Sequence, residues 1–383
     1  VSRLLGMNKK EEANKVGTVA FFTAIIIGIL FTLFSLVFIE PLLSFFGGSH
    51  EVMELSKSYG KFILLGSVFV MGNMAMNNLL RSEGSAKLSM VGMVIGSVLN
   101  VFLDPLFIFT FGLGISGAAI ATVISQIVTF IILLTKYLSH HSLIRIEARY
   151  FHPSSQMYGE IFKVGIPTFF RQVLFSISLG ILNKGAVRYG GPDLLAAISL
   201  SFKISMIISY GIFGLGQGFQ PVAGYNFGSG NSRRVTESLT YTLKIGLYAV
   251  LIGCGAMLVF DDQILSIFKA TDTVVAYAMV SLRYLAVSII LMSVTNTIGV
   301  FYQALGKGRE SLLLSVARQG IFLIPLILIL PGFIGKTGIL SAQMFADILT
   351  LLLTGIIFGY YLLSGKMKSE FQAVEKMEGA YEE

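Results

Sequence analysis

A single carboxylate interrupts an apolar stretch of the sequence. Asp104 is the only charged residue between Leu88 and Thr110. Asn100 lies four residues earlier, and on a helix it therefore shares a face with Asp104. Pro105 follows directly and removes the backbone amide that would otherwise bond the carbonyl of Val101. A carboxylate, an amide oxygen and a freed carbonyl in one helical turn are oxygen ligands suited to Na⁺, and the carboxylate also accepts a proton.

The next apolar stretch places a hydroxyl at the same depth. A carboxylate inside a membrane costs about 2.5–3.5 kcal/mol on insertion scales and is usually functional. The short turn 111–113 makes the two stretches antiparallel. Asp104 lies about seven residues before this turn and Thr122 about nine residues after it, a similar depth at about 1.5 Å per residue. We predict a cation-coupling site of Asp104, Asn100 and Thr122. The alternative is a structural ion pair between Asp104 and Lys or Arg of another helix.

Composition indicates what kind of protein holds these residues. The chain has 383 residues, of which 54% are hydrophobic and 13% charged, whereas a soluble domain carries about 25% charged residues. This excludes a soluble enzyme, a disordered protein and a nucleic-acid binder. The net charge of +7 is typical of membrane proteins with basic cytoplasmic loops. The sole cysteine, Cys254, excludes an internal disulfide. We predict an all-α polytopic membrane protein.

Ten apolar stretches have about the length that a membrane helix needs. A polar stretch, 136–157, separates the first four from the last six. The ten are 16–39, 53–80, 88–110, 114–135, 161–186, 194–219, 239–260, 274–302, 312–333 and 338–363.

Basic residues predict the orientation of these helices. Most of them fall in one alternate set of loops, which is therefore expected to be cytoplasmic together with both chain ends. The members of this set include Arg3, Lys9, Lys10, Lys15, Arg81, Lys87, Lys136, Arg145, Arg149, Arg233, Arg234, Lys307, Arg309, Lys366 and Lys368.

An internal repeat divides the chain. A shift of 222 positions aligns 41–46 with 263–268 and Gly84 with Gly306, and a shift of 221 aligns 114–117 with 335–338. The second copy has six helices and the first has four. We expect a 6+6 parent whose first two helices, about 65 residues, are absent here. The alternative is a natural ten-helix protein.

The repeat predicts two lobes of the same orientation, an architecture typical of secondary transporters. We assign 1–137 to the first lobe, 138–156 to a cytoplasmic linker, 157–365 to the second lobe and 366–383 to a cytoplasmic tail. A membrane-embedded enzyme is not supported, because all four histidines fall in loops. His140 and His141 with Glu147 lack the spacing of a metal site.

Several motifs together resemble the MATE family of multidrug and toxic compound extrusion transporters, in particular its bacterial multidrug-export branch. The resemblance covers essentially the whole chain. The motifs are 2–6, 81–84, 99–107, 114–122, 220–228 and Arg318-Gln319 before Pro325.

The resemblance implies twelve helices in two six-helix lobes, and efflux of cationic amphipathic compounds in exchange for H⁺ or Na⁺. The family's cation-site residues match Asn100, Asp104 and Thr122. In the second lobe, the seventh family helix offers Gln172 and the tenth offers no acid, which makes coupling there doubtful.

Other polar residues within the helices are candidates for a drug cavity, with interhelical hydrogen bonding as the alternative. Lys203 lies on the same helix face as Tyr210 and Gln217, but its positive charge would repel cationic drugs. Asp347 is expected to pair with a basic residue such as Arg318. The candidates are Asn73, Asn77, Gln126, Gln172, Ser176, Asn183, Tyr210 and Gln217.

We therefore predict a monomeric antiporter of the bacterial inner membrane. Its partners would be small cationic drugs and the lipid bilayer, without nucleic acid and with no cofactor besides the coupling H⁺ or Na⁺. Two alternatives remain. A lipid-linked oligosaccharide flippase of the same superfamily would need a strongly basic cavity, and this chain has few basic residues at mid-membrane. An uncoupled channel-like or structural membrane protein would show no gradient-dependent efflux.

Overall fold

The protein is built from helices. The computed structural model describes residues 1–45, 53–139, 142–367 and 369–372. The chain is 90% helical, without a strand among the described residues. Within these ranges, nine helices are long and apolar enough to cross a membrane. The longest, α7 (Ser155–Gly228), has 74 residues and is broken at Gly191. The prediction of an all-α polytopic membrane protein is confirmed.

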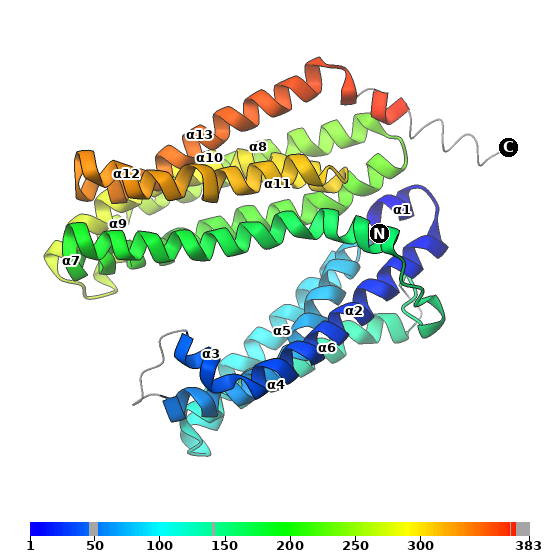
Figure 1. The fold of residues 1–383 in the computed structure, drawn as a ribbon, viewed down its shortest axis with the longest axis horizontal. Coiled ribbons are helices and arrows are strands. Elements are labelled where there is room, and N and C mark those ends of the chain that lie inside the picture. Colours follow the sequence, from blue (N-terminus) through cyan, green and yellow to red (C-terminus); the bar gives the residue numbers. More distant parts are fainter. Residues whose placement is uncertain (46–52, 140–141, 368, 373–383) are drawn as a thin grey trace. The chain divides into compact units, whose positions relative to one another are not determined.

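The break in α7 supplies the tenth pass. A straight helix of 74 residues would be about 110 Å long, several times the thickness of a bilayer. At Gly191 the backbone adopts φ 69° and ψ −166°, a conformation that only glycine adopts readily. Pro192 follows and cannot donate to the preceding turn. The two halves, drawn in green in Figure 1, correspond to the predicted stretches 161–186 and 194–219.

The chain divides into two compact units, Val1–Met157 and Tyr158–Glu383. In the first unit, α4 packs on both α2 and α6, and α6 packs in turn on α5 (Figure 1). Its elements are α1 (Ser2–Gly6), α2 (Lys10–Val37), α3 (Ile39–Phe45), α4 (Met53–Ser82), α5 (Ala86–Pro105), η1 (Leu106–Thr110), α6 (Gly114–Leu138) and η2 (Ala148–Tyr150).

The second unit has two apolar cores. One joins the second half of α7 to α8, α9 and α10, and the other joins the middle of α7 to η3, α12 and α13. The elements after α7 are α8 (Ser232–Val259), α9 (Asp261–Ser266), α10 (Asp272–Ala304), α11 (Gly308–Val316), η3 (Ala317–Leu323), α12 (Ile324–Ile334) and α13 (Lys336–Leu363).

The backbone follows the repeat seen in the sequence. Helix α8 begins and ends 222 residues after α2 does, the same shift that aligns the sequence motifs. Positive φ angles recur in equivalent turns, at Gly84 and Gly306 and at Gly114 and Gly335. The two copies therefore turn at the same places.

The hairpin of each copy brings two helices into close contact at a glycine. A Cβ atom on Gly117 would lie 2.6 Å from the carbonyl oxygen of Phe107, and one on Gly338 would lie 2.6 Å from the carbonyl carbon of Leu330. In both cases the obstacle is backbone, which cannot rotate away. The hairpin geometry shared by the two copies therefore depends on these two glycines.

We expect Gly117→Ala to destabilise the protein by about 1–3 kcal/mol, because the added methyl group overpacks the α5–α6 hairpin. Gly211→Ala is the control, since nothing lies within 4 Å of a Cβ built there. Thermal unfolding of the purified protein in detergent measures both. Equal unfolding temperatures for the two variants would contradict the close approach.

The segment after α6 is attached to the first unit by a buried carboxylate. Glu83, 7% exposed, accepts hydrogen bonds at Oε2 from the Ser142 hydroxyl, from the Leu143 amide at 2.9 Å and from the Ile144 amide at 3.3 Å. Asn14 Oδ1 accepts a further bond from the Arg145 amide at 2.8 Å. These contacts hold the start of the linker against α2 and α4.

Glu83→Ala is expected to release this segment, because each buried amide left without an acceptor costs about 1–3 kcal/mol. Trypsin should then cleave after Arg145 faster than in the unaltered protein. Glu147→Ala, which removes an ion pair with Arg149 in the same linker, should leave that cleavage rate unchanged. An unaltered rate in Glu83→Ala would show that Glu83 does not hold the linker.

Candidate coupling site and polar network

The predicted cation site begins with an irregular helix end. Helix α5 ends at Pro105 and continues as the π-helical segment η1. Pro105 has no N–H for the Val101 carbonyl, and the amide of Leu106 donates to Leu103. The Val101 carbonyl therefore lacks its usual helical donor. Single π-helical turns often occur at functional sites.

The three residues predicted for this site lie together. Asn100 Nδ2 donates to Asp104 Oδ1 at 3.0 Å and lies 3.5 Å from Thr122 Oγ1. The Thr122 hydroxyl donates to the Ala118 carbonyl at 3.0 Å, so its lone pairs remain available. All three side chains are half-buried. Spacing along α5 and depth in α6 thus predicted a contact between two helices.

The carboxylate of Asp104 has no cationic partner in the described part of the chain. The ion pairs found within 4.0 Å there do not include it. Among these residues, Asp104 therefore forms no structural ion pair with Lys or Arg, which was the alternative interpretation. Its negative charge and its oxygen lone pairs are therefore available to a proton or a cation. Rotation of the Asn100 amide would add its oxygen to those of Asp104 and Thr122.

A second polar group lies on α4 and α6. Asn73 Nδ2 donates to both the backbone carbonyl and the side-chain Oε1 of Gln126, each at 2.9 Å. Asn77 is 5% exposed, and its side-chain nitrogen and oxygen both lack a hydrogen-bond partner. The Oδ1 atom of Asn73 also lacks one. Gln126 follows Thr122 by one helical turn. The first unit thus brings three predicted cavity residues near each other.

The predicted cavity residues of the second unit are more open. Gln172, Ser176, Tyr210 and Gln217 are exposed on this unit, and Asn183 is half-buried. Ser176 donates to the backbone carbonyl of Gln172 at 3.2 Å, and Lys203 is exposed. Ser176 therefore bonds within its own helix, whereas Asn73 of the first unit bonds to a second helix.

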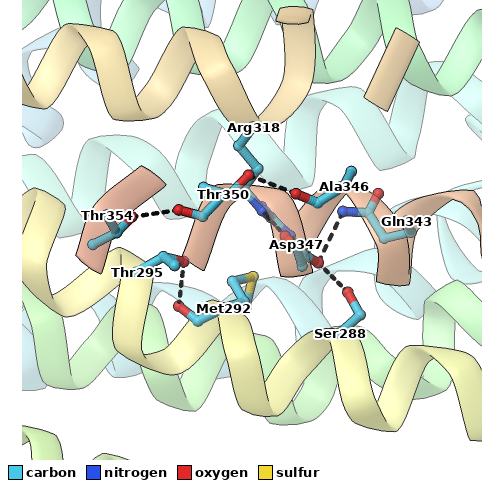
Figure 2. Close-up of polar contacts among 9 residues, drawn as sticks. All are labelled: Ser288, Met292, Thr295, Arg318, Gln343, Ala346, Asp347, Thr350 and Thr354. Carbon is cyan, nitrogen blue, oxygen red and sulfur yellow. Dashed lines mark hydrogen bonds and ion pairs between the residues drawn. The ribbon is translucent and has the colours of Figure 1, made fainter. Parts of the chain in front are cut away.

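Asp347 is the centre of a buried network in the second unit, which Figure 2 shows. Its carboxylate is 0% exposed. Arg318 donates from Nε to Oδ1 at 2.5 Å and from Nη2 to Oδ2 at 3.2 Å. Ser288 and Gln343 also donate to Oδ2, the latter at 3.2 Å. The predicted pair of Asp347 with Arg318 is confirmed, and this fully bonded acid differs from Asp104.

The sequence prediction missed the other members of this region. Gln343 precedes Asp347 by four residues, so helical spacing was a usable signal. Ser288 comes from α10, and nothing in its local sequence indicates that contact. Arg171 is a charged residue inside an apolar stretch, which was a signal, and it lines a cavity with Arg318.

Metal ligation by side chains has no support in the described residues, where no three His, Cys, Asp or Glu side chains come together. His140 and His141, considered with Glu147 as a metal site, lie outside the described residues. A coupling Na⁺ at Asp104 would instead rely on neutral oxygens beside one carboxylate.

Comparison with known proteins decides the family. The family model described as MatE matches residues 1–106 and 167–329. The chain belongs to the MatE family. It is 27% identical over 367 residues to the multidrug export protein MepA of Staphylococcus aureus strain bovine RF122 / ET3-1, covering 96% of this chain and 80% of that protein. The MepA protein of Staphylococcus saprophyticus is 28% identical over 371 residues, with the same coverage.

Solved MatE structures show the same fold. An outward-facing multidrug resistance MATE family transporter of the MOP superfamily superposes with a TM-score of 0.89 at 27% identity. The match covers 98% of this chain and 82% of that one. The prediction of a MATE-like transporter fold is confirmed. The MatE relatives are named as exporters, which also confirms that this protein is a transporter of small molecules and not an enzyme.

Proposed function

We propose that this MatE protein exports cationic amphipathic compounds in exchange for H⁺ or Na⁺, with Asp104 as the coupling residue. The observation that carries the proposal is the carboxylate of Asp104, which has no cationic partner among the described residues. It accepts a hydrogen bond from Asn100 at 3.0 Å and lies beside the hydroxyl of Thr122. This group changes charge when it binds a cation. Asp347 of the second unit lacks this property, because Arg318 already neutralises it.

The coupling follows from competition between charges. While Asp104 is ionised, its field favours a cationic compound nearby. Binding of H⁺ or Na⁺ cancels that charge, so the affinity for the drug falls and release is favoured. By linkage, the drug lowers the affinity for the cation by the same factor. This arrangement needs no second acid, in line with the fully paired Asp347 of the second unit.

Each unit by itself offers polar and aromatic side chains as candidate drug contacts. Tyr210 is 64% exposed and offers a ring face to a cation. The buried, unpaired groups of Asn77 favour a polar ligand or water nearby. The remaining contacts in this proposal come from Asn73, Gln126, Gln172, Ser176, Asn183 and Gln217.

The same proposal includes the setting of the protein. The similarity to bacterial export proteins supports a bacterial inner membrane, and the basic loops support a cytoplasmic location of both termini. A monomer is sufficient, because the candidate site lies within the first unit.

Export from intact cells tests the function. A drug-sensitive bacterial host expressing the full-length protein should extrude a cationic dye such as ethidium in a saturable manner. Collapsing the proton or the sodium gradient with an ionophore should stop that export. Saturable export that continues without both gradients would contradict cation coupling, and absence of export would contradict the drug-efflux function.

A further inference from the structure

A small cavity lies inside the second unit, among α7, α10, α11, η3 and α13. Its volume is about 40 Å³, which is room for a small ion with a few waters. Its polar lining includes Arg171, Arg318, Asn296, Gln303, Ser311 and Thr350. The space is therefore small, and two guanidinium groups face it.

The charges around this cavity do not balance. Arg318 is neutralised by Asp347 at 2.5 Å. Arg171 contacts the ring of Phe213, 5.9 Å from the ring centroid, and no carboxylate among the described residues pairs with it. Arg171 lies about 24 Å along α7 from its first residue, Ser155, well inside the apolar stretch. One positive charge is thus left over at membrane depth, where an unpaired charge is costly.

Hydrogen-bond donors without acceptors surround the same space. Asn296 Nδ2 is buried and bonds to nothing in the described structure. Arg318 uses Nε and Nη2 for Asp347 and keeps Nη1. The hydroxyl groups of Thr295 and Thr350 donate to the backbone carbonyls of Met292 and Ala346 (Figure 2). The unused donors at this cavity therefore include the guanidinium group of Arg171, Nη1 of Arg318 and the Nδ2 amide group of Asn296.

We propose that this cavity is a binding site for a small monovalent anion of about the size of chloride. The anion would lie between Arg171 and the Nη1 of Arg318, with the Asn296 amide as a third donor. It would cancel the excess charge and satisfy the buried donor at once. This site is separate from the cation site at Asp104, and its detection needs no transport.

Thermal unfolding in matched salts tests the site. The full-length protein in detergent is titrated with sodium chloride against sodium gluconate at constant sodium concentration and ionic strength. A bound anion stabilises the folded state by mass action, so the unfolding temperature should rise with chloride and saturate. Arg171→Gln should raise the half-saturating chloride concentration on the order of tenfold or more. Asn296→Ala should raise it less.

A matched control separates this effect from general loss of charge. Arg188 lies on the same helix, is exposed and also contacts a ring, that of Tyr189. Arg188→Gln should keep the chloride response. In gluconate, Arg171→Gln should equal or exceed the unaltered protein in stability, because it removes an uncompensated charge. An unchanged half-saturating chloride concentration in Arg171→Gln, or no chloride response in the unaltered protein, would overturn the proposal.

Bromide provides a test without substitutions. Crystals of the unaltered protein grown in bromide should show an anomalous peak between Arg171 and Arg318. A peak there supports the site even if Arg171→Gln does not fold. Bromide peaks elsewhere on the protein and none in this cavity would overturn it.

Discussion

Replacing Asp104 with asparagine is expected to abolish drug-driven cation counterflow. The asparagine side chain has nearly the same shape and can still accept a hydrogen bond from Asn100. It carries no charge and binds no proton, so the site can no longer alternate between charged and neutral states. In vesicles containing the full-length Asp104→Asn variant, counterflow should fall to the level of protein-free vesicles.

Two controls test whether lost counterflow comes from misfolding or from the removal of any acidic residue. The unfolding temperature should change little, because the substitution keeps the local packing around α5 and α6. Asp193→Asn removes an exposed acid beside the bend in α7 and should leave counterflow intact. Undiminished exchange in Asp104→Asn would remove Asp104 from the mechanism.

Removing Asp347 is expected to have the largest effect on stability. Asp347→Ala leaves Arg318, whose side chain is 18% exposed, without its counter-charge inside the second unit. Breaking one partner of a buried ion pair costs about 3–5 kcal/mol. Chemical unfolding should be followed in chloride-free buffer, so that an anion in the neighbouring cavity does not compensate for the lost carboxylate.

The double variant Arg318→Met with Asp347→Leu distinguishes pairing from packing. Because it removes both charges and keeps apolar volume, it should recover most of the lost stability. Asp272→Ala, at the exposed first turn of α10, should cost less than about 1 kcal/mol. If Asp347→Ala were no more destabilising than Asp272→Ala, the network in Figure 2 would not hold the unit together.

Hydropathy predicted the fold because backbone polar groups must be satisfied inside each membrane helix. The ten apolar stretches therefore appear as ten helical passes, including the two joined in α7. The turn between those two contains Gly191 and Pro192. Repeated positive φ angles at Gly84 and Gly306 explain why glycines aligned between the copies.

The sites were predicted to different extents, for physical reasons. Asn100 and Asp104 are one helical turn apart, and a three-residue turn fixed the depth of Thr122, so local geometry was enough. The contact of Ser288 with Asp347 joins residues from α10 and α13, and helical spacing contains no information about it. The cavity beside Arg171 depends on how five elements pack. Only the unexplained charge of Arg171 in an apolar stretch was visible beforehand.

In the proposed mechanism the protein moves a cation against a drug through Asp104. The most direct measurement uses vesicles that contain the unaltered full-length protein and no initial gradient of H⁺ or Na⁺. An imposed gradient of a cationic drug should then drive H⁺ or Na⁺ in the opposite direction, seen with a pH-sensitive dye or with radioactive sodium. Drug movement without any opposing flow of either cation would contradict the account.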